Sequence, residues 1–291
     1  MPRIPDEFLQ CAIYLYPSVR AAEQGESAGG SGFLVHVASN NPGWGFVYAV
    51  TNSHVIREGA SSVVRMNTKD GRLAVLEVEV DRWTHHPEGD DLAVTPIPLT
   101  SAHNYMAIDR STWFVTPQFM VEKHVGLGDE VFMVGRFVNH EGRQTNAPSV
   151  RFGAIAQMNR EPIRHPRGFD QESFLVEARS LPGYSGSPVF LYIAPFSSHP
   201  TQRGISGRWT IRLLGVDWSH INHALQVLDG AGKPPSDERG QAAGLHVNTN
   251  TGMMGVIPAW RLSRLLDDDG LVAERRRYDE EIAKGDFPRT A

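Results

Sequence analysis

The sequence predicts an all-β protein that ends in one α-helix, and three observations support this prediction. Short apolar and β-branched runs recur along the chain, each bounded by turn residues. Glycine and proline are frequent, with 28 and 19 copies among 291 residues, and they are spread through the chain. Apolar residues at convincing helical spacing occur only near the C-terminus. Many short strands followed by one helix favour a β-sandwich or a β-barrel.

The strands of the first half are expected at short apolar runs separated by turns, such as the Asn-Asn-Pro-Gly of residues 40–43. The expected strands are residues 11–16, 32–37, 46–51, 62–66, 73–80 and 92–97. Residues 105–120 have no clear period, and we expect them to connect two halves of the chain.

The second half repeats this rhythm and then changes to a helix. Its expected strands are residues 130–137, 150–158, 173–178, 189–193, 210–216, 244–247 and 254–258. Two polar loops are expected at residues 194–209 and 220–243, and loops of this length are usually functional or mobile. Pro258 suits the first turn of a helix, and Trp260, Leu262, Leu265 and Leu266 follow at helical spacing.

Composition excludes several classes of partner and site. There are 28 Lys and Arg against 33 Asp and Glu, so a basic face for nucleic acid is not expected. No run approaches 18 apolar residues, so a membrane-spanning helix is not expected. Cys11 is the single cysteine, which excludes an internal disulfide and a Cys-rich zinc site. Without a signal-peptide core, a cytoplasmic location is expected, or a periplasmic one if a leader was removed.

Three short segments carry the residue types of nucleophilic catalysis. Residues 183–188 read Gly-Tyr-Ser-Gly-Ser-Pro, a turn that can present Ser185. A serine hydroxyl needs a base and nearby donors for the developing negative charge. His54 follows a predicted strand, and Asp91 precedes another. Taken singly, Ser185 is typical of a surface turn, His54 of a partly buried side chain with satisfied hydrogen bonds, and Asp91 of the entry to a strand. Their order, with gaps of 37 and 94 residues, favours the catalytic interpretation.

The combined motifs resemble the trypsin-like (chymotrypsin-fold) serine peptidases. The segments are residues 30–35 (Gly-Ser-Gly-Phe-Leu-Val), 50–55 (Val-Thr-Asn-Ser-His-Val), 91–94 (Asp-Leu-Ala-Val) and 183–188. The match is nearest to the bacterial branch with the high-temperature-requirement proteases and the glutamyl endopeptidases. It implies a single peptidase domain over residues 1–291, with two six-stranded antiparallel β-barrels at about 10–115 and 125–258. A C-terminal helix over 259–285 completes the expected fold.

The resemblance also implies a role for each matching residue. Ser185 attacks the scissile carbonyl, His54 takes and returns the proton, and Asp91 orients the imidazole. The amides of Gly183 and Ser185 form the oxyanion hole. Asp90 is expected to be a solvated neighbour of Asp91.

The two histidines that precede Asp91 do not indicate a metal site. His85 and His86 are expected to be solvated loop histidines, because no complete zinc ligand spacing surrounds them. No metal and no cofactor are expected.

Two departures from the family bear on activation and specificity. Tyr184 cannot form the ion pair with a new N-terminus that an acid makes there in digestive enzymes. We therefore expect no activation by N-terminal cleavage, with the oxyanion loop ordered by other contacts or only on regulation. Asp217 favours a basic residue before the scissile bond, whereas Arg179 favours an acidic one or pairs with Asp217. The expected substrate-binding residues are Arg179, Ser180, Asp217, Trp218 and Ser219.

The leading prediction is a serine endopeptidase that acts on a protein or peptide substrate through an acyl-enzyme. We expect narrow substrate choice or regulated activity, and the sequence leaves open a regulatory protein partner. The alternative is a pseudoprotease that serves as a binding or scaffold module. Reactivity of Ser185 distinguishes these predictions.

Overall fold

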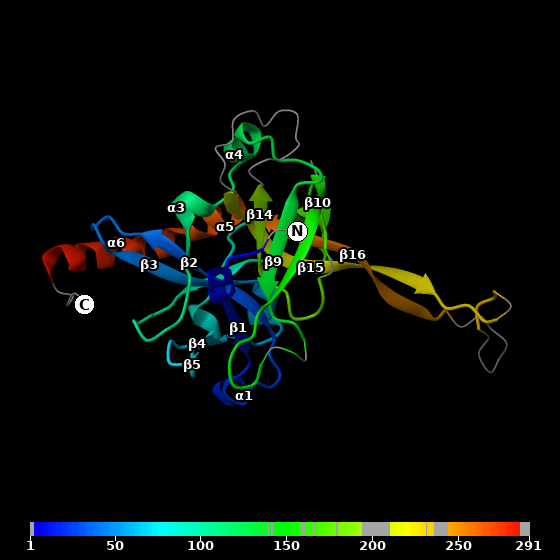
Figure 1. The fold of residues 1–291 in the computed structure, drawn as a ribbon, viewed down its shortest axis with the longest axis horizontal. Coiled ribbons are helices and arrows are strands. Elements are labelled where there is room, and N and C mark those ends of the chain that lie inside the picture. The colour runs from blue at the N-terminus through cyan, green and yellow to red at the C-terminus, as the bar shows by residue number, and fades with distance from the viewer. Residues whose placement is uncertain are drawn as a thin grey trace.

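The computed structural model describes residues 3–138, 140, 142–158, 161–165, 167–178, 180–193, 210–230, 232–235 and 244–285. These residues form mainly strands, and helices follow the last strand (Figure 1). The predicted all-β class with a helical C-terminal end is confirmed. Within the described ranges, no helix has the length and apolar character needed to cross a membrane.

The N-terminal half forms one sheet of eight strands in the order β5-β4-β1-β2-β3-β7-β6, with β8 paired parallel to β2. The strands are β1 (Ala12–Tyr16), β2 (Gly30–Ala38), β3 (Gly45–Thr51), β4 (Val63–Asn67), β5 (Leu73–Leu76), β6 (Thr84–His85), β7 (Ala93–Pro96) and β8 (Ile108–Asp109). The six runs predicted from sequence all contain strands. The strands β6 and β8 were not predicted, because two residues are too few to show a period.

The second half forms a closed six-stranded barrel in the order β10-β13-β16-β15-β14-β9. Its strands are β9 (Glu130–Gly135), β10 (Ser149–Met158), β13 (Phe174–Glu177), β14 (Pro188–Ile193), β15 (Thr210–Gln226) and β16 (His246–Pro258). Alternate side chains of β9 point to opposite faces. Val131 and Met133 join the cluster within the barrel, while Phe132 and Val134 join the cluster shared with the other half.

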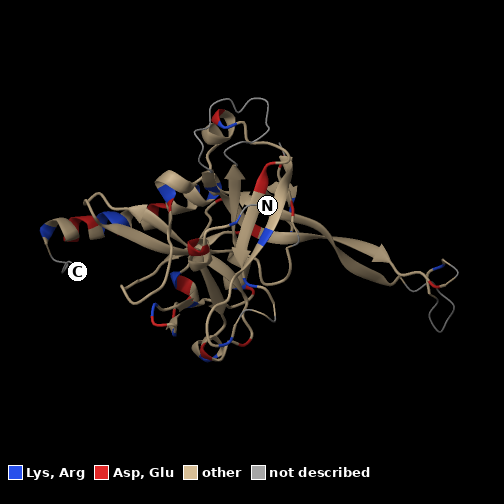
Figure 2. Ribbon diagram, viewed as in Figure 1, with Lys and Arg blue, Asp and Glu red and all other residues tan. Residues whose placement is uncertain are grey.

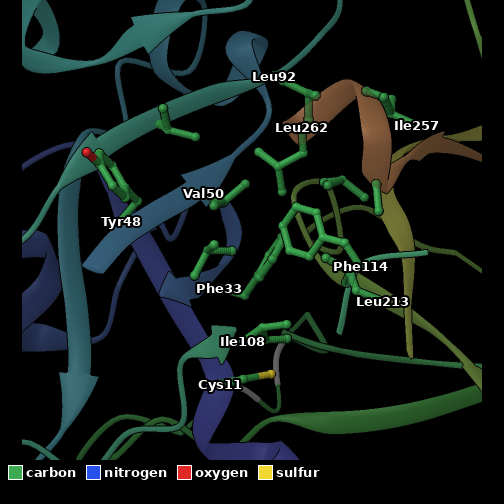
Figure 3. Close-up of a cluster of buried hydrophobic side chains, with 14 of the residues drawn as sticks. Cys11, Phe33, Tyr48, Val50, Leu92, Ile108, Phe114, Leu213, Ile257 and Leu262 are labelled. Carbon is green, nitrogen blue, oxygen red and sulfur yellow. The ribbon is translucent and has the colours of Figure 1, made fainter. Parts of the chain in front are cut away.

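The two halves share a buried apolar cluster that fixes their relative position. Phe33 and Val50 contribute from the first sheet, Leu213 and Ile257 from the barrel, and Phe114 from the connection (Figure 3). Because protein interiors are close-packed, residues at the rim of this cluster are held at defined distances across the junction of the two halves.

The strands β15 and β16 continue beyond the barrel as a long two-stranded arm (Figure 1). Leu225 pairs with Val247, and these side chains are 48% and 53% exposed. The prediction of a loop over 220–243 was therefore wrong for its first part, since β15 runs to Gln226. Solvent reaches both faces of the arm, so its sequence lacks the apolar alternation of a half-buried strand. The other predicted loop, residues 194–209, lies outside the described residues.

The C-terminal helical segment consists of two helices, α5 (Ala259–Leu266) and α6 (Asp269–Lys284), instead of the one expected. The break follows from Asp268, whose side chain accepts from Gly270 N and caps α6. The other helical segments are η1 (Asp6–Cys11), α1 (Val19–Gln24), α2 (Ser53–Arg57), η2 (Val80–Arg82), α3 (Arg110–Trp113) and α4 (Pro117–Glu122).

The helix α6 returns to the N-terminal half, where it packs beside β2 and β3 (Figure 1). Asp279 accepts from Ser39 Oγ at 2.5 Å and from Asn40 Nδ2 at 2.8 Å. Arg275 donates to the hydroxyl of Tyr48 at 3.0 Å. The charged residues of α6 stand out along the helix in Figure 2, and these two make buried contacts instead of facing solvent. The helix α6 is therefore hydrogen-bonded to β3 and to the turn between β2 and β3.

Candidate active site

His54 lies in the first turn of α2, directly after β3 ends at Thr51. The β-branched and aromatic run of β3 gives way to Asn52, which has extended backbone angles and precedes the helix. The Asn52 side chain donates to the backbone carbonyl of Asp91 at 2.8 Å. This bond ties the start of α2 to the loop that enters β7.

Two hydrogen bonds join His54 to Asp91. The Nδ1 atom lies 2.6 Å from Asp91 Oδ2, and the backbone N–H of His54 donates to Oδ1 at 2.9 Å. An ionised carboxylate only accepts, so the ring proton lies on Nδ1 and Nε2 keeps a free lone pair. The Asp91 side chain is 3% exposed and that of His54 is 19% exposed. The structure thus presents an oriented imidazole with an unprotonated nitrogen.

Asp91 remains ionised although it is buried. Burial raises its pKa, but the nearby N–H edge of His165 and the hydrogen bonds from His54 lower it, and the net pKa lies well below its usual range. The backbone N–H of Asp91 donates to Gln171 Oε1 at 2.9 Å. The carboxylate is therefore fixed in charge and in position.

Asp90 is not the solvated neighbour that the sequence suggested. It is 6% exposed, and Gln171 Nε2 donates to its Oδ1 at 2.9 Å. Arg261 of α5 donates to its Oδ2, and His86 Nε2 lies 3.3 Å from the same oxygen. The C-terminal helix covers this carboxylate, and a contact between segments so far apart leaves no signal in the local sequence.

The expectation of solvated loop histidines was also wrong. The His86 side chain is fully buried, and burial lowers its pKa. His85 is half-buried, and its Nδ1 lies 2.8 Å from Ser53 Oγ. Burial, together with the nearby charge of Arg57, lowers the pKa of His85 to about 4. Both rings have structural partners.

The turn before β14 leaves two backbone N–H groups available. Tyr184, Gly186 and Ser187 donate their N–H groups to protein carbonyls. The N–H groups of Gly183 and Ser185 donate to no acceptor in the described part of the chain. Gly183 has φ of +99°, a conformation that favours glycine. Two free donors separated by one residue can stabilise negative charge on an oxygen.

Glycines allow this turn to approach His54. A Cβ on Gly30 would lie 2.8 Å from Val55, the neighbour of His54, and 3.3 Å from the carbonyl oxygen of Ser185. Ser31 N donates to that same carbonyl at 3.0 Å. No hydrogen bond joins Ser185 Oγ to His54 among the described contacts. The serine and histidine segments are adjacent, and their side chains are not yet bonded.

Tyr184 anchors the turn to the barrel, as the expectation of other ordering contacts required. Its side chain is fully buried. Its hydroxyl is hydrogen-bonded to Ser149, and Arg151 Nε donates to it at 3.1 Å. The Arg151 guanidinium also lies 5.3 Å from the centre of the Tyr184 ring. The turn is ordered without a charged N-terminus.

Asp217, Trp218 and Ser219 lie on β15 beside the turn. Asp217 N donates to Ser187 O, and Gly186 N donates to Asp217 O, both at 2.9 Å. Asp217 is fully buried, and Ser180 Oγ donates to its Oδ2 at 2.8 Å. Burial raises the pKa of Asp217 to about 7, while the Ser180 hydrogen bond opposes the rise. The structure brings Ser180 and Asp217 together, and Arg179 lies outside the described residues.

Sequence reasoning missed three residues at this site. His165 Nε2 lies 3.6 Å from Asp91 Oδ2, and Gln171 bridges Asp90 to Asp91. A Cβ on Gly183 would lie 2.6 Å from the guanidinium of Arg136, so this cation covers one side of the turn. None of the three lies in a motif. Only the pairing of distant strands brings them to the site.

Comparisons with known proteins give one family match and distant structural likenesses. Residues 30–192, more than half of the chain, match the family model described as Trypsin-like peptidase domain. No curated protein matches the chain. Among solved structures, Deg5 is 18% identical with a TM-score of 0.44, covering 73% of this chain and 81% of its own. An inactive mutant form of Rv3671c from M. tuberculosis H37Rv is 13% identical with a TM-score of 0.45, covering 92% and 88%.

Proposed function

Because the chain belongs to the trypsin-like peptidase domain family, we propose that it is a serine endopeptidase whose triad is Ser185, His54 and Asp91. One observation carries the proposal most directly. His54 is held by Asp91 through both its ring and its backbone, and this leaves Nε2 as a base. The two unused N–H groups of the turn at Ser185 support the same assignment.

The proposed reaction has two halves. The Ser185 hydroxyl gives its proton to His54 Nε2 as its Oγ bonds to the scissile carbonyl carbon. The N–H groups of Gly183 and Ser185 stabilise the resulting oxyanion. The imidazolium then protonates the leaving amine as the C–N bond breaks, which leaves an acyl-enzyme. Water, deprotonated by the same nitrogen, releases the acid and restores Ser185.

The unbonded Ser185 fits this reaction. Catalytic hydrogen bonds are often long or absent without substrate and tighten in the complex. Ser185 and His54 are both only partly buried, so a substrate can reach them. The turn itself is already ordered, because Tyr184 anchors it to the barrel.

For specificity, we retain the proposal of a basic residue before the scissile bond. Asp217 supports it, because a buried carboxyl with one free oxygen gains most from a cation. Among the described residues, Asp217 Oδ1 has no hydrogen-bond partner. Trp218 and Ser219 continue β15 and offer backbone groups for pairing with the substrate strand. Such a preference would make the proteolysis narrow, as expected from the sequence.

Labelling with a fluorophosphonate probe tests the proposed function. Wild type is expected to react, and Ser185→Ala is expected to lose all labelling. Turnover of peptide substrate should fall by about 10⁶, by analogy with other triads. The matched control is Ser187→Ala, two residues away, whose hydroxyl has no partner within the described ranges. Folded wild type that does not react would contradict the proposal and favour the pseudoprotease alternative.

A further inference from the structure

A small hairpin brings a second histidine to Asp91. The strands β11 (Ile163–Arg164) and β12 (Asp170–Gln171) pair with each other, and His165 follows β11 directly. His165 N donates to Phe169 O at 2.7 Å, and Gly168 N donates to His165 O at 2.9 Å. This tight turn fixes the backbone of His165.

The His165 ring is held between two aromatic rings. It stacks on Phe169 with a centroid distance of 4.2 Å and on Trp218 with a distance of 4.5 Å. Trp218 is itself fixed, because its Nε1 donates to Ser173 at 2.9 Å. His165 is 2% exposed. Stacking on both faces leaves the ring edge as its only polar contact surface.

The hydrogen bonds of the ring assign its tautomer. Arg167 N donates to His165 Nδ1 at 3.1 Å, so Nδ1 is the acceptor and Nε2 carries the proton of the neutral ring. This Nε2 faces Asp91 Oδ2 at 3.6 Å and has no hydrogen-bond partner among the residues described. A buried N–H donor without a partner is costly, so contact with the nearest carboxylate is strongly favoured.

The same hairpin also positions the backbone of Asp91. Gln171, at the end of β12, accepts from Asp91 N, as described above. At the other end of the hairpin, Arg167 forms an ion pair with Glu58, which follows α2 and His54. The hairpin therefore spans from the acid to the helix of the proposed base.

We infer that His165 is a positioning residue for the proposed triad: its Nε2–H faces Asp91 Oδ2 at 3.6 Å, and the positive end of this N–H group offsets part of the negative charge that acts on His54. This inference rests on the proposed function only for its effect on catalysis. The donor competes with His54 Nδ1 for the same carboxylate oxygen. It holds the carboxylate in place and moderates its attraction for a protonated His54.

Several ionisable groups surround this contact. His54 of α2 and His165 of the hairpin face Asp91 directly, and the charge of Asp91 raises the pKa of His85 in β6, against the larger effect of burial. Asp90, the neighbour of Asp91 in the chain, is paired with Arg261 of α5. The charge of His54 lowers the pKa of Asp217 in β15, against the larger effect of burial. The test must therefore measure the His54 titration itself.

The experiment compares wild type with His165→Phe and His165→Gln. Phenylalanine keeps the stacking and removes the donor, whereas glutamine keeps an N–H donor without the ring. In His165→Phe, we expect kcat to fall about 10- to 100-fold with KM nearly unchanged. The His54 pKa, followed by NMR, should rise, because the positive end of a dipole has been removed from Asp91. The acid limb of kcat/KM should move to higher pH with it.

The glutamine variant and a control separate positioning from packing. His165→Gln is expected to recover most of the kcat and the wild-type His54 pKa. The control is His103→Gln, a buried histidine that contacts Thr100 instead of this site and should change neither value. Equal losses in His165→Phe and His165→Gln, with an unchanged His54 pKa in both, would overturn the inference.

Folding and catalysis are monitored separately. Thermal unfolding shows whether each variant folds. If His165→Phe does not fold, His165→Met replaces it, since methionine also fills space without an N–H donor. If wild type fails to label with the fluorophosphonate, the proposed function fails. The His54 titration still decides the His165–Asp91 contact, because it needs no turnover.

Discussion

Asp91 and Asp217 are both buried beside the same imidazole, yet burial has opposite outcomes for them. The charge of His54 favours ionisation of each. The pKa of Asp91 nevertheless lies well below its usual range, while that of Asp217 rises to about 7. Asp91 accepts two hydrogen bonds from His54 and faces His165. Asp217 accepts from Ser180 and keeps one oxygen without a hydrogen-bond partner among the described residues.

The difference shows that the number of hydrogen-bond donors, more than the extent of burial, decides whether a buried carboxyl is charged. A carboxylate with several donors is permanently ionised and suits the orientation of a base. A carboxyl with few donors is ionised only at higher pH, and a nearby cation stabilises its ionised form most. One site thus contains both behaviours in residues of the same type.

The largest expected effect comes from neutralising the fully bonded carboxylate. Asp91→Asn should lower kcat and the fluorophosphonate labelling rate by about 10⁴, because asparagine can hold the wrong tautomer of His54. The labelling rate is measured by stopping the fluorophosphonate reaction at a series of times, at several pH values. An unchanged rate would show that Asp91 does not orient the base, and the contrast with Asp217 would lose its functional meaning.

Asp217→Asn is expected to act on substrate choice. The kcat/KM preference for Lys or Arg over a neutral residue before the scissile bond should drop about 100-fold, with fluorophosphonate labelling retained. In wild type the same preference should weaken as pH falls through about 7, where Asp217 becomes protonated. A peptide library profiled at pH 6 and pH 8 tests both statements. A preference for Leu or Glu would contradict them.

The smallest effect concerns stability. The pKa of Asp217 is raised in the folded state from 3.8 to about 7, so the folded protein holds this proton more tightly than the unfolded chain. The resulting contribution to the free energy of unfolding is fully present below pH 4 and is lost as pH rises through 7. Asparagine does not titrate, so the stability of Asp217→Asn relative to wild type should increase as pH rises from 4 to 7, by on the order of 4 kcal/mol at most. Thermal unfolding at pH 5 and pH 8 measures the change. A gain that is equal at both pH values would contradict it.

The sequence predicted those features that depend on neighbours along the chain. The strands were found because apolar runs and turns alternate, and the candidate triad was proposed because each member lies in a recognisable motif. His165 and Gln171 were missed, because their role depends on how the β11–β12 hairpin packs. Asp90 and His86 were misjudged for a related reason, since Arg261 buries them from the far end of the chain.

The pairing of Arg261 with Asp90 also sets the order in which the molecule is completed during synthesis. These residues are separated by 171 positions, which a ribosome adding 5–20 residues per second covers in roughly 10 to 35 s. Ser185 and the whole barrel leave the ribosome before Arg261 does. The loop that carries Asp90 and Asp91 therefore has no ionic partner in α5 until the strand β16 has been made. The nascent chain therefore carries this part of the candidate site unfinished until Arg261 has been added.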